Sequence, residues 1–232
     1  MPRTAPDDRF DQLVGRATDI FIELGYRRTQ MADVAEAMGV AKGTLYLYVE
    51  SKEALFDLAC RHADAPPPLP RPATLPVPTP APGATAAFVA DQLARQRVPP
   101  ALAAALARRR VIDVRAEIAT IVGELFDVLA RNRRGLKLLD RSARDHPTLA
   151  ALWFEQARGG LVALLQRYLE DRQRRRLVRP FPDPAVAARL LVETIVFWAV
   201  HRHWDPHPQP VRDAIARATV IRFATGALAA KE

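Results

Sequence analysis

The sequence has 232 residues, enough for one large or two small folded domains. Of these residues 49% are hydrophobic and 26% charged, and this hydrophobic content excludes global disorder. Its single cysteine, Cys60, excludes an intramolecular disulfide and a thiolate metal cluster. The first residues lack a signal-peptide core, and no apolar run reaches the roughly 18 residues that span a bilayer, so we expect a cytoplasmic protein without membrane contact.

The formal net charge of +8 would favour nucleic acid as a partner, but the distribution of this charge does not support that inference. Residues 1–62 carry eight Lys and Arg against ten Asp and Glu. The positive excess therefore lies in residues 63–232, and DNA binding has to be inferred from local motifs.

The N-terminal segment has the apolar spacing of several short helices. Apolar side chains first recur three and four positions apart up to Gly25. A shorter pattern runs over Met31–Met38 and stops at Gly39, where glycine can adopt the positive φ of a tight turn. A third helix is expected from Ala41, and Ser51 is a candidate N-cap for a fourth.

Two short helices on either side of Gly39 have the dimensions of a helix-turn-helix, in which the second helix enters the major groove of DNA. The segment Ala41–Tyr48 is too polar and too short for a core helix, and its first residues suit base edges or phosphates. We therefore predict a helix-turn-helix over about residues 30–49. A motif of this kind can instead serve protein interaction, which is the alternative reading.

The same segment resembles the signature of the tetracycline-repressor (TetR) family over roughly residues 9–62. The resemblance rests on Gly25-Tyr26, Thr29, Asp33-Val34-Ala35, Gly39 to Tyr46, Tyr48-Val49 and Ser51 to Phe56. It implies an all-α protein with an N-terminal three-helix DNA-binding domain and a C-terminal helical domain for ligand binding and dimerisation. Ala32 departs from the pattern, because many relatives carry arginine or another polar residue there.

The resemblance also implies which residues contact DNA. They are Gln30, Lys42, Gly43, Thr44, Tyr46, Tyr48 and Lys52. Lys42 and Thr44 would face the bases, and Gly43 would permit close approach of the backbone. The remaining four would contact the sugar-phosphate backbone.

Nine prolines lie in residues 66–82, a density that excludes a helix and favours extended polyproline II structure. We therefore expect a semi-stiff or disordered linker here, which divides a DNA-binding domain (residues 1–62) from a sensing and dimerisation domain (residues 83–232). Such a linker could not act as a rigid lever. Any coupling between the domains is expected to pass through packed residues of the fourth helix, namely Leu55, Phe56 and Leu58.

The C-terminal part reads as further amphipathic helices, and we find no convincing strand pair. Residues 184–204 are apolar on almost every face, which indicates a helix buried on all sides. Together with a final helix over about 211–230, this segment is expected to form the dimer interface, with Leu190, Phe197, Trp198 and Ile221 as contacts. The basic residues from Arg172 to Arg179 are expected to be the solvated end of a long helix.

Ligand and catalytic signals are weaker. Gly159-Gly160 lies within the expected long helix and could open room for a ligand near Phe126, Trp153 and Gln156. His201 and His203 are two positions apart and would diverge on a regular helix, so we expect no metal site, and we expect no cofactor. No nucleophile motif or phosphate-binding glycine loop is present, so we do not expect an enzyme.

The sequence therefore predicts a homodimeric transcriptional repressor that binds a palindromic operator in double-stranded DNA and is released by a small-molecule effector. The alternative is a ligand-independent architectural or co-regulatory DNA-binding protein. An activator that binds DNA only with its ligand would use the same residues.

Overall fold

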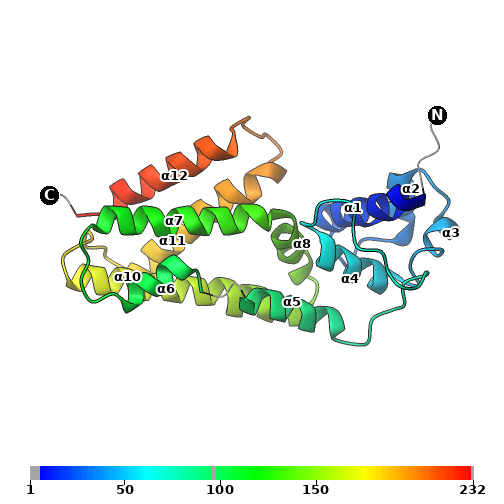
Figure 1. Ribbon diagram of the computed structural model, residues 1–232, viewed down its shortest axis with the longest axis horizontal. Helices are drawn as coiled ribbons and strands as arrows, with labels where there is room; N and C mark the ends of the chain where they lie inside the picture. Colours follow the sequence, from blue (N-terminus) through cyan, green and yellow to red (C-terminus); the bar gives the residue numbers. More distant parts are fainter. Residues whose placement is uncertain (1–5, 96–97, 231–232) are drawn as a thin grey trace. The chain divides into compact units, whose positions relative to one another are not determined.

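The computed structural model of the chain describes residues 6–95 and 98–230 (Figure 1). Every regular element in these ranges is a helix, which confirms the all-α prediction. The chain forms two compact units. Unit 1 comprises Met1–Gln92 and Arg134–Trp153, and unit 2 comprises Leu93–Arg133 and Phe154–Glu232. No described helix has the length and apolar character needed to cross a membrane.

Unit 1 is built around the first helix. Its helices are α1 (Pro6–Leu24), α2 (Met31–Met38), α3 (Lys42–Leu45), α4 (Lys52–His62), most of α5 (Ala84–Arg95), α8 (Arg133–Ala143) and α9 (Pro147–Ala150). The apolar stripe of α1, from Phe10 to Phe21, is buried against α2 and α4, as its spacing predicts. Ser51 caps α4 as expected, because its Oγ accepts a hydrogen bond from the amide of Ala54 at 3.1 Å.

The proline-rich residues 66–82, which we call the strap, differ from the free linker that composition predicts. Leu69 is buried, and its amide donates to the Asp11 carboxylate of α1 at 3.3 Å. Val77 forms an isolated parallel β-bridge with Val49. The strap is thus an ordered part of unit 1, and the contact-defined boundary of this unit lies at Gln92, beyond the predicted linker. Extended polyproline structure has free backbone carbonyls, and they can pair with a neighbouring chain.

Unit 2 is a packed set of longer helices. Its elements are α6 (Pro100–Ala107), α7 (Val114–Arg131), α10 (Gly160–Arg174), α11 (Pro184–Ala199), the 3-10 helix η2 (His201–Trp204) and α12 (Asp213–Leu228). Helix α7 packs against α11 and α12, and α10 packs against α6 and α11. A π-helix, η1 (Ala151–Gly159), replaces the regular helix expected before Gly160, and the division between the units falls within it.

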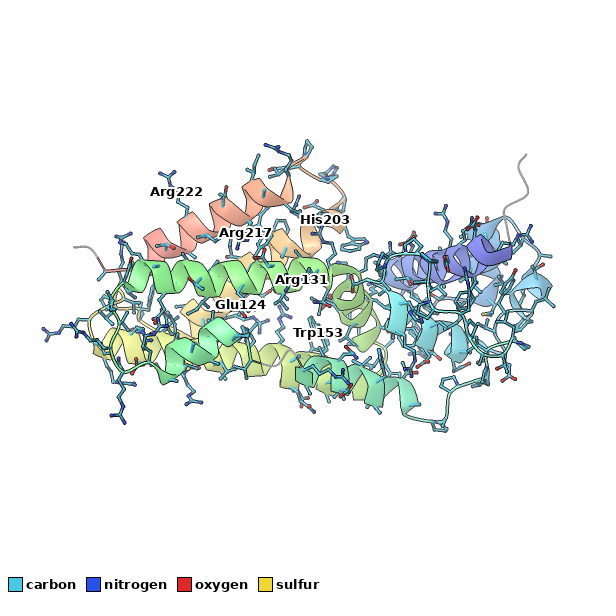
Figure 2. The ribbon with its side chains drawn as sticks, viewed as in Figure 1. Glu124, Arg131, Trp153, His203, Arg217 and Arg222 are labelled. Carbon is cyan, nitrogen blue, oxygen red and sulfur yellow. The ribbon has the colours of Figure 1, made fainter. Side chains whose placement is uncertain are left out.

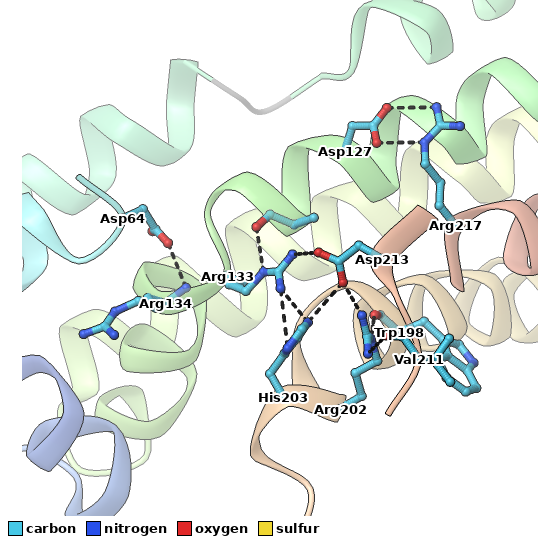
Figure 3. Close-up of polar contacts among 11 residues, drawn as sticks. Asp64, Asp127, Arg133, Arg134, Trp198, Arg202, His203, Val211, Asp213 and Arg217 are labelled. Carbon is cyan, nitrogen blue, oxygen red and sulfur yellow. Dashed lines mark hydrogen bonds and ion pairs between the residues drawn. The ribbon is translucent and has the colours of Figure 1, made fainter. Parts of the chain in front are cut away.

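Polar contacts join α12 to its neighbours within unit 2 (Figure 3). Asp127 of α7 accepts two parallel hydrogen bonds from Arg217, at 2.8 and 2.9 Å. Asp213, in the first turn of α12, pairs with Arg133 and Arg202. Burial alone would raise the pKa of Asp213, but the hydrogen bond and charge of Arg133 outweigh burial and lower it, so the carboxylate stays ionised.

A buried ionic cluster links α6, α7 and α10. The Arg172 side chain is 0% exposed, so the prediction that this residue belongs to a solvated helix end is wrong. Its guanidinium donates to Glu117 Oε1 at 2.8 Å and to the carbonyl of Ala105 at 2.6 Å, and Tyr168 donates to the same carboxylate oxygen at 3.1 Å. Periodicity places Arg172 correctly on α10, but its partners are distant in sequence.

Burial and charge act in opposite directions on this cluster. Burial alone would lower the pKa of Arg172, but hydrogen bonding to Glu117 and the charge of that carboxylate raise it, so the guanidinium remains a cation. Burial, followed by the Glu117 carboxylate, raises the pKa of Tyr168, so the phenol keeps its proton and can donate it. Each charged group in the cluster therefore depends on its partner.

We expect Glu117→Ala to destabilise the protein by about 3 kcal/mol, because the substitution removes the more buried of the two carboxylates that pair with the Arg172 guanidinium and leaves only Asp171. The measurement is urea unfolding followed by circular dichroism. The double variant Glu117→Ala with Arg172→Met should recover much of this loss, because it removes both charges. Equal stability of the single and double variants would show that the pair is not energetically coupled.

Candidate DNA-binding site

The turn between α2 and α3 has the geometry of a helix-turn-helix. Gly39 ends α2 with a left-handed backbone (φ 64°), a conformation that glycine adopts without steric cost. The amide of Val40 returns to the carbonyl of Ala35 at 3.0 Å, which closes the end of α2. Leu45, on the inner side of α3, is fully buried and anchors the short helix against unit 1. The predicted turn is therefore formed by the residues that the sequence indicates.

The N-cap residue of α2, Gln30, is fixed by a local hydrogen bond. The backbone amide of Gln30 donates to the Asp33 carboxylate at 2.7 Å, so one of the free amides at this helix start is satisfied. Gln30 itself is exposed at the start of the helix-turn-helix. This position suits a polar contact with a phosphate.

The predicted DNA-contacting residues other than Lys52 lie at the surface of unit 1. Gln30, Lys42, Gly43 and Tyr46 are exposed, and Thr44 and Tyr48 are partly exposed. Sequence reasoning missed Leu47, which is 67% exposed although it is a large apolar residue next to Tyr46. Apolar side chains at such a surface can contact thymine methyl groups.

Lys52 has partners within the protein. Its ammonium donates to the carbonyls of Tyr26 and Thr29, both at 3.1 Å, and lies 4.6 Å from the centroid of the Tyr26 ring. An ammonium has three N–H donors, so one remains for a phosphate. Lys52 therefore closes the segment between α1 and α2 onto the start of α4, a role that spacing alone did not indicate.

Tyr26 also joins the segment between α1 and α2 to α4, through its hydroxyl and its ring. Its hydroxyl donates to Glu53 Oε1 at 3.0 Å, and its ring lies against the Phe56 ring with centroids 4.7 Å apart. Burial, then the hydrogen bond and charge of Glu53, raise the pKa of Tyr26 to about 12. The phenol therefore stays protonated and keeps donating, which fixes the approach of the chain to α2.

Residues of the C-terminal half also hold these helices, within unit 1. Asp64, just after α4, accepts a hydrogen bond from the amide of Arg134 at 2.8 Å (Figure 3). It also accepts one from the amide of Gly135 at 2.9 Å. The Arg134 side chain reaches the carbonyl of Gly15 in α1, and Arg141 reaches the carbonyl of Glu23. Helix α8 is therefore part of the frame that carries the helix-turn-helix. No sequence signal pairs these distant residues.

The residues predicted to bind a ligand do not share one environment. Phe126 is buried in α7 of unit 2, whereas Trp153 is buried in unit 1 and donates its indole N–H to Asp140 at 3.0 Å (Figure 2). Gln156 is exposed in η1. Both aromatic rings are therefore parts of folded cores. Among the described residues, no three His, Cys, Asp or Glu side chains are grouped to hold a metal ion.

The residues predicted at the dimer interface lie on α11 and α12. Leu190 and Phe197 are exposed on α11, while Trp198 and Ile221 are partly buried. In the single chain one side of α11 is exposed, so burial on all sides, as its apolar composition predicts, would require a second copy of the chain. One apolar stripe of α11 remains open.

Comparison with known proteins agrees with the helix-turn-helix. Residues 13–59 match the family described as "Bacterial regulatory proteins, tetR family". The fatty acid metabolism regulator protein of Bacillus subtilis is 38% identical over 45 residues, which are 19% of this chain and 23% of that protein. An uncharacterized HTH-type transcriptional regulator of the same organism, YhgD, is 42% identical over 50 residues, or 22% of this chain and 26% of the relative. The chain thus spans about a quarter of the length of these curated relatives.

Solved structures share the fold over nearly the whole chain. The ketosteroid transcriptional regulator KstR2 of Mycobacterium tuberculosis has a TM-score of 0.54 at 15% identity and covers 96% of each chain. A regulatory protein of the tetR family from Rhodococcus RHA1 also has a TM-score of 0.54 at 15% identity, covering 99% of this chain and 100% of that one. The family match over residues 13–59 and the geometry of the turn at Gly39 agree, so this N-terminal segment is a helix-turn-helix domain of the tetR family of bacterial regulatory proteins.

Proposed function

We propose that the protein is a transcriptional regulator that binds a palindromic operator in double-stranded DNA as a homodimer and is released by a small-molecule effector. The observation that carries this proposal is the α2–Gly39–α3 turn with Lys42 and Thr44 at the surface. A helix placed in this way reads base edges in the major groove, and two copies related by a two-fold axis read a palindrome. The proposal includes no enzymatic activity.

Selection of bound sequences from random DNA tests this function. The expected product is a palindrome whose half-sites are separated by about one or more helical turns, because each copy of the dimer reads one half-site. Enrichment of no sequence, together with steep salt dependence of binding, would instead support an architectural DNA-binding protein that recognises phosphates alone.

We expect Lys42→Ala and Thr44→Ala to change which bases are selected at one position in each half-site, at a cost of about 1–3 kcal/mol for a lost base contact. Lys52→Ala should instead weaken binding to all sequences alike and lower the salt slope by about one, since its remaining N–H would contact a phosphate. Fluorescence anisotropy with the selected operator and with unrelated DNA measures both effects. Unchanged preference in both Lys42 and Thr44 variants would contradict this placement of the recognition helix.

The open face of α11 and α12 in unit 2 supports dimerisation. Leu190 of α11 is 63% exposed and Phe223 of α12 is 65% exposed, and the two helices pack against each other. The neighbouring residues Val186, Phe197 and Ile215 add to this face. Large apolar side chains that recur on adjacent helices mark a protein interface. A second copy of the chain fits, because a two-fold interface brings the same patch of each copy together.

We expect Leu190→Asp and Phe223→Asp to give folded monomers with weakened operator binding, because these side chains are exposed in the single chain but would be buried between copies. Light scattering gives the mass, and circular dichroism gives the helix content. Ile112→Asp is the matched control, since Ile112 is 95% exposed in the loop before α7, away from this face. Dimers of native mass in both interface variants would show that the copies associate elsewhere.

The effector is proposed to bind among the helices of unit 2, where Phe126 of α7 is the candidate contact. Trp153 belongs to unit 1 and Gln156 is exposed, so neither shares the environment of Phe126. Coupling to DNA is proposed to involve the fourth helix, where Leu55, Phe56 and Leu58 are all buried. Phe56 is the strongest candidate because its ring contacts both Tyr26 and Phe21, with centroids 4.7 and 5.1 Å apart. A change in the packing of α4 would therefore reach the segment that leads into α2.

A further inference from the structure

We propose that the strap is a positioning element for DNA reading, and that Val77 and Thr79 fix the recognition helix α3 in the pose that sets sequence preference. This inference rests on the proposed function, because it assumes that α3 reads DNA. It assigns a role in recognition to a segment that lies outside the helix-turn-helix.

The contacts of the strap concentrate on the residues that follow α3. The amide of Val77 donates to the carbonyl of Tyr48 at 2.8 Å, and the amide of Glu50 donates to the carbonyl of Val77 at 3.0 Å. These two bonds form one rung of a parallel ladder with Val49 between them. The residues that follow α3 are therefore held by main-chain pairing with a segment that is distant in sequence.

Thr79 extends the same attachment to the next helix. Its amide donates to Glu50 Oε2 at 2.9 Å, and its hydroxyl lies 2.8 Å from Ser51 Oγ. Ser51 is the N-cap of α4, so the hydroxyl of Thr79 binds the side chain that starts this helix. Val77 and Thr79 together hold Tyr48, Glu50 and Ser51, the second part of the connection between α3 and α4.

The order of residues 76–82 explains how so many prolines can pair. Proline occupies every second position, and Val77, Thr79 and Ala81 occupy the others. Successive residues of an extended segment direct their N–H groups to opposite sides. The three residues that retain an N–H therefore share one side. Val77 and Thr79 donate these N–H groups to the connection after α3. Proline on the other side leaves no free donor and fixes φ, which suits an edge strand.

Both flanks of the strap are attached to unit 1. At its start, Arg71 pairs with Asp11 of α1 at 3.0 Å and its guanidinium lies over the Phe10 ring. Beyond its end, the hydroxyl of Thr85 in α5 donates to Asp57 of α4 at 2.8 Å. The segment between α4 and α5 (Figure 1) is therefore anchored before and after the Val77 pairing, so its position on the connection after α3 is fixed from both directions.

The test compares main-chain and side-chain variants in the full-length chain. Val77→Pro removes the N–H that Tyr48 accepts, yet it suits the extended backbone that Pro76 and Pro78 already impose. Val77→Ala is the matched control, because it keeps the N–H. Thr79→Val removes the hydroxyl at nearly constant shape, and Thr79→Ser restores it.

The readout is the ratio of affinities for the operator selected by the wild-type protein and for random DNA of the same length at one salt concentration. We expect Val77→Pro to lower operator affinity about tenfold, the equivalent of one lost hydrogen bond, with random-DNA affinity unchanged because the phosphate contacts remain. Thr79→Val should act in the same direction more weakly, and Val77→Ala and Thr79→Ser should resemble the wild type.

Equal losses on both DNAs, or no loss on either, would overturn the positioning role. If Val77→Pro fails to fold by circular dichroism, the Thr79→Val and Thr79→Ser pair decides by the same ratio. A wild-type protein that selects no sequence would overturn the proposed function, and the strap proposal with it, whereas a selective wild type with unaltered variants overturns the strap proposal alone.

Discussion

Helix α3, the proposed recognition helix, has only four residues, and a helix of this length does not hold its own geometry in water. Its pose therefore depends on what surrounds it. Leu45 anchors it from below, Gly39 sets the angle at which the chain enters, and the connection after it is paired with the strap. The rest of unit 1 acts through these three attachments, because each is in turn fixed by α1, α2 or α4.

The charged residues near the helix-turn-helix illustrate the same dependence. Residues 1–62 have a slight acidic excess, so no large positive field holds DNA against this domain. Two charged residues at the start of α4 are held by contacts within the protein. Lys52 donates to the carbonyls of Tyr26 and Thr29, and Glu53 accepts from the Tyr26 hydroxyl. Specific binding would then rely on accurate placement of a few groups, such as Lys42 and Thr44, and less on bulk attraction. A frame that fixes the backbone around α3 meets that requirement.

Local signals in the sequence predict the helices, their caps and the turn, but not the contacts that these elements make with segments distant in sequence. The stripe of α1, the turn at Gly39 and the cap at Ser51 each depend on residues a few positions apart, and all are present as predicted. The composition of the strap predicts a semi-stiff or disordered linker and not its pairing with Val49, because proline density reports backbone conformation and carries no information on pairing. Arg172 was expected in solvent because its partner Glu117 lies 55 residues earlier, a separation that helical periodicity cannot detect.

The division of the chain limits how a signal could pass between a sensor and the DNA-binding helices. The chain crosses from one unit to the other at Gln92, Arg133 and Trp153. The first crossing follows α5, which is tied to α4 through Thr85 and Asp57, and the second precedes α8, which is tied to α1 and to Asp64. The third lies in the π-helix η1 at Trp153, whose indole N–H donates to Asp140 of α8. A displacement at any crossing would therefore act on α1 and α4, the helices that carry the turn at Gly39, and reach α3 without a direct contact of its own.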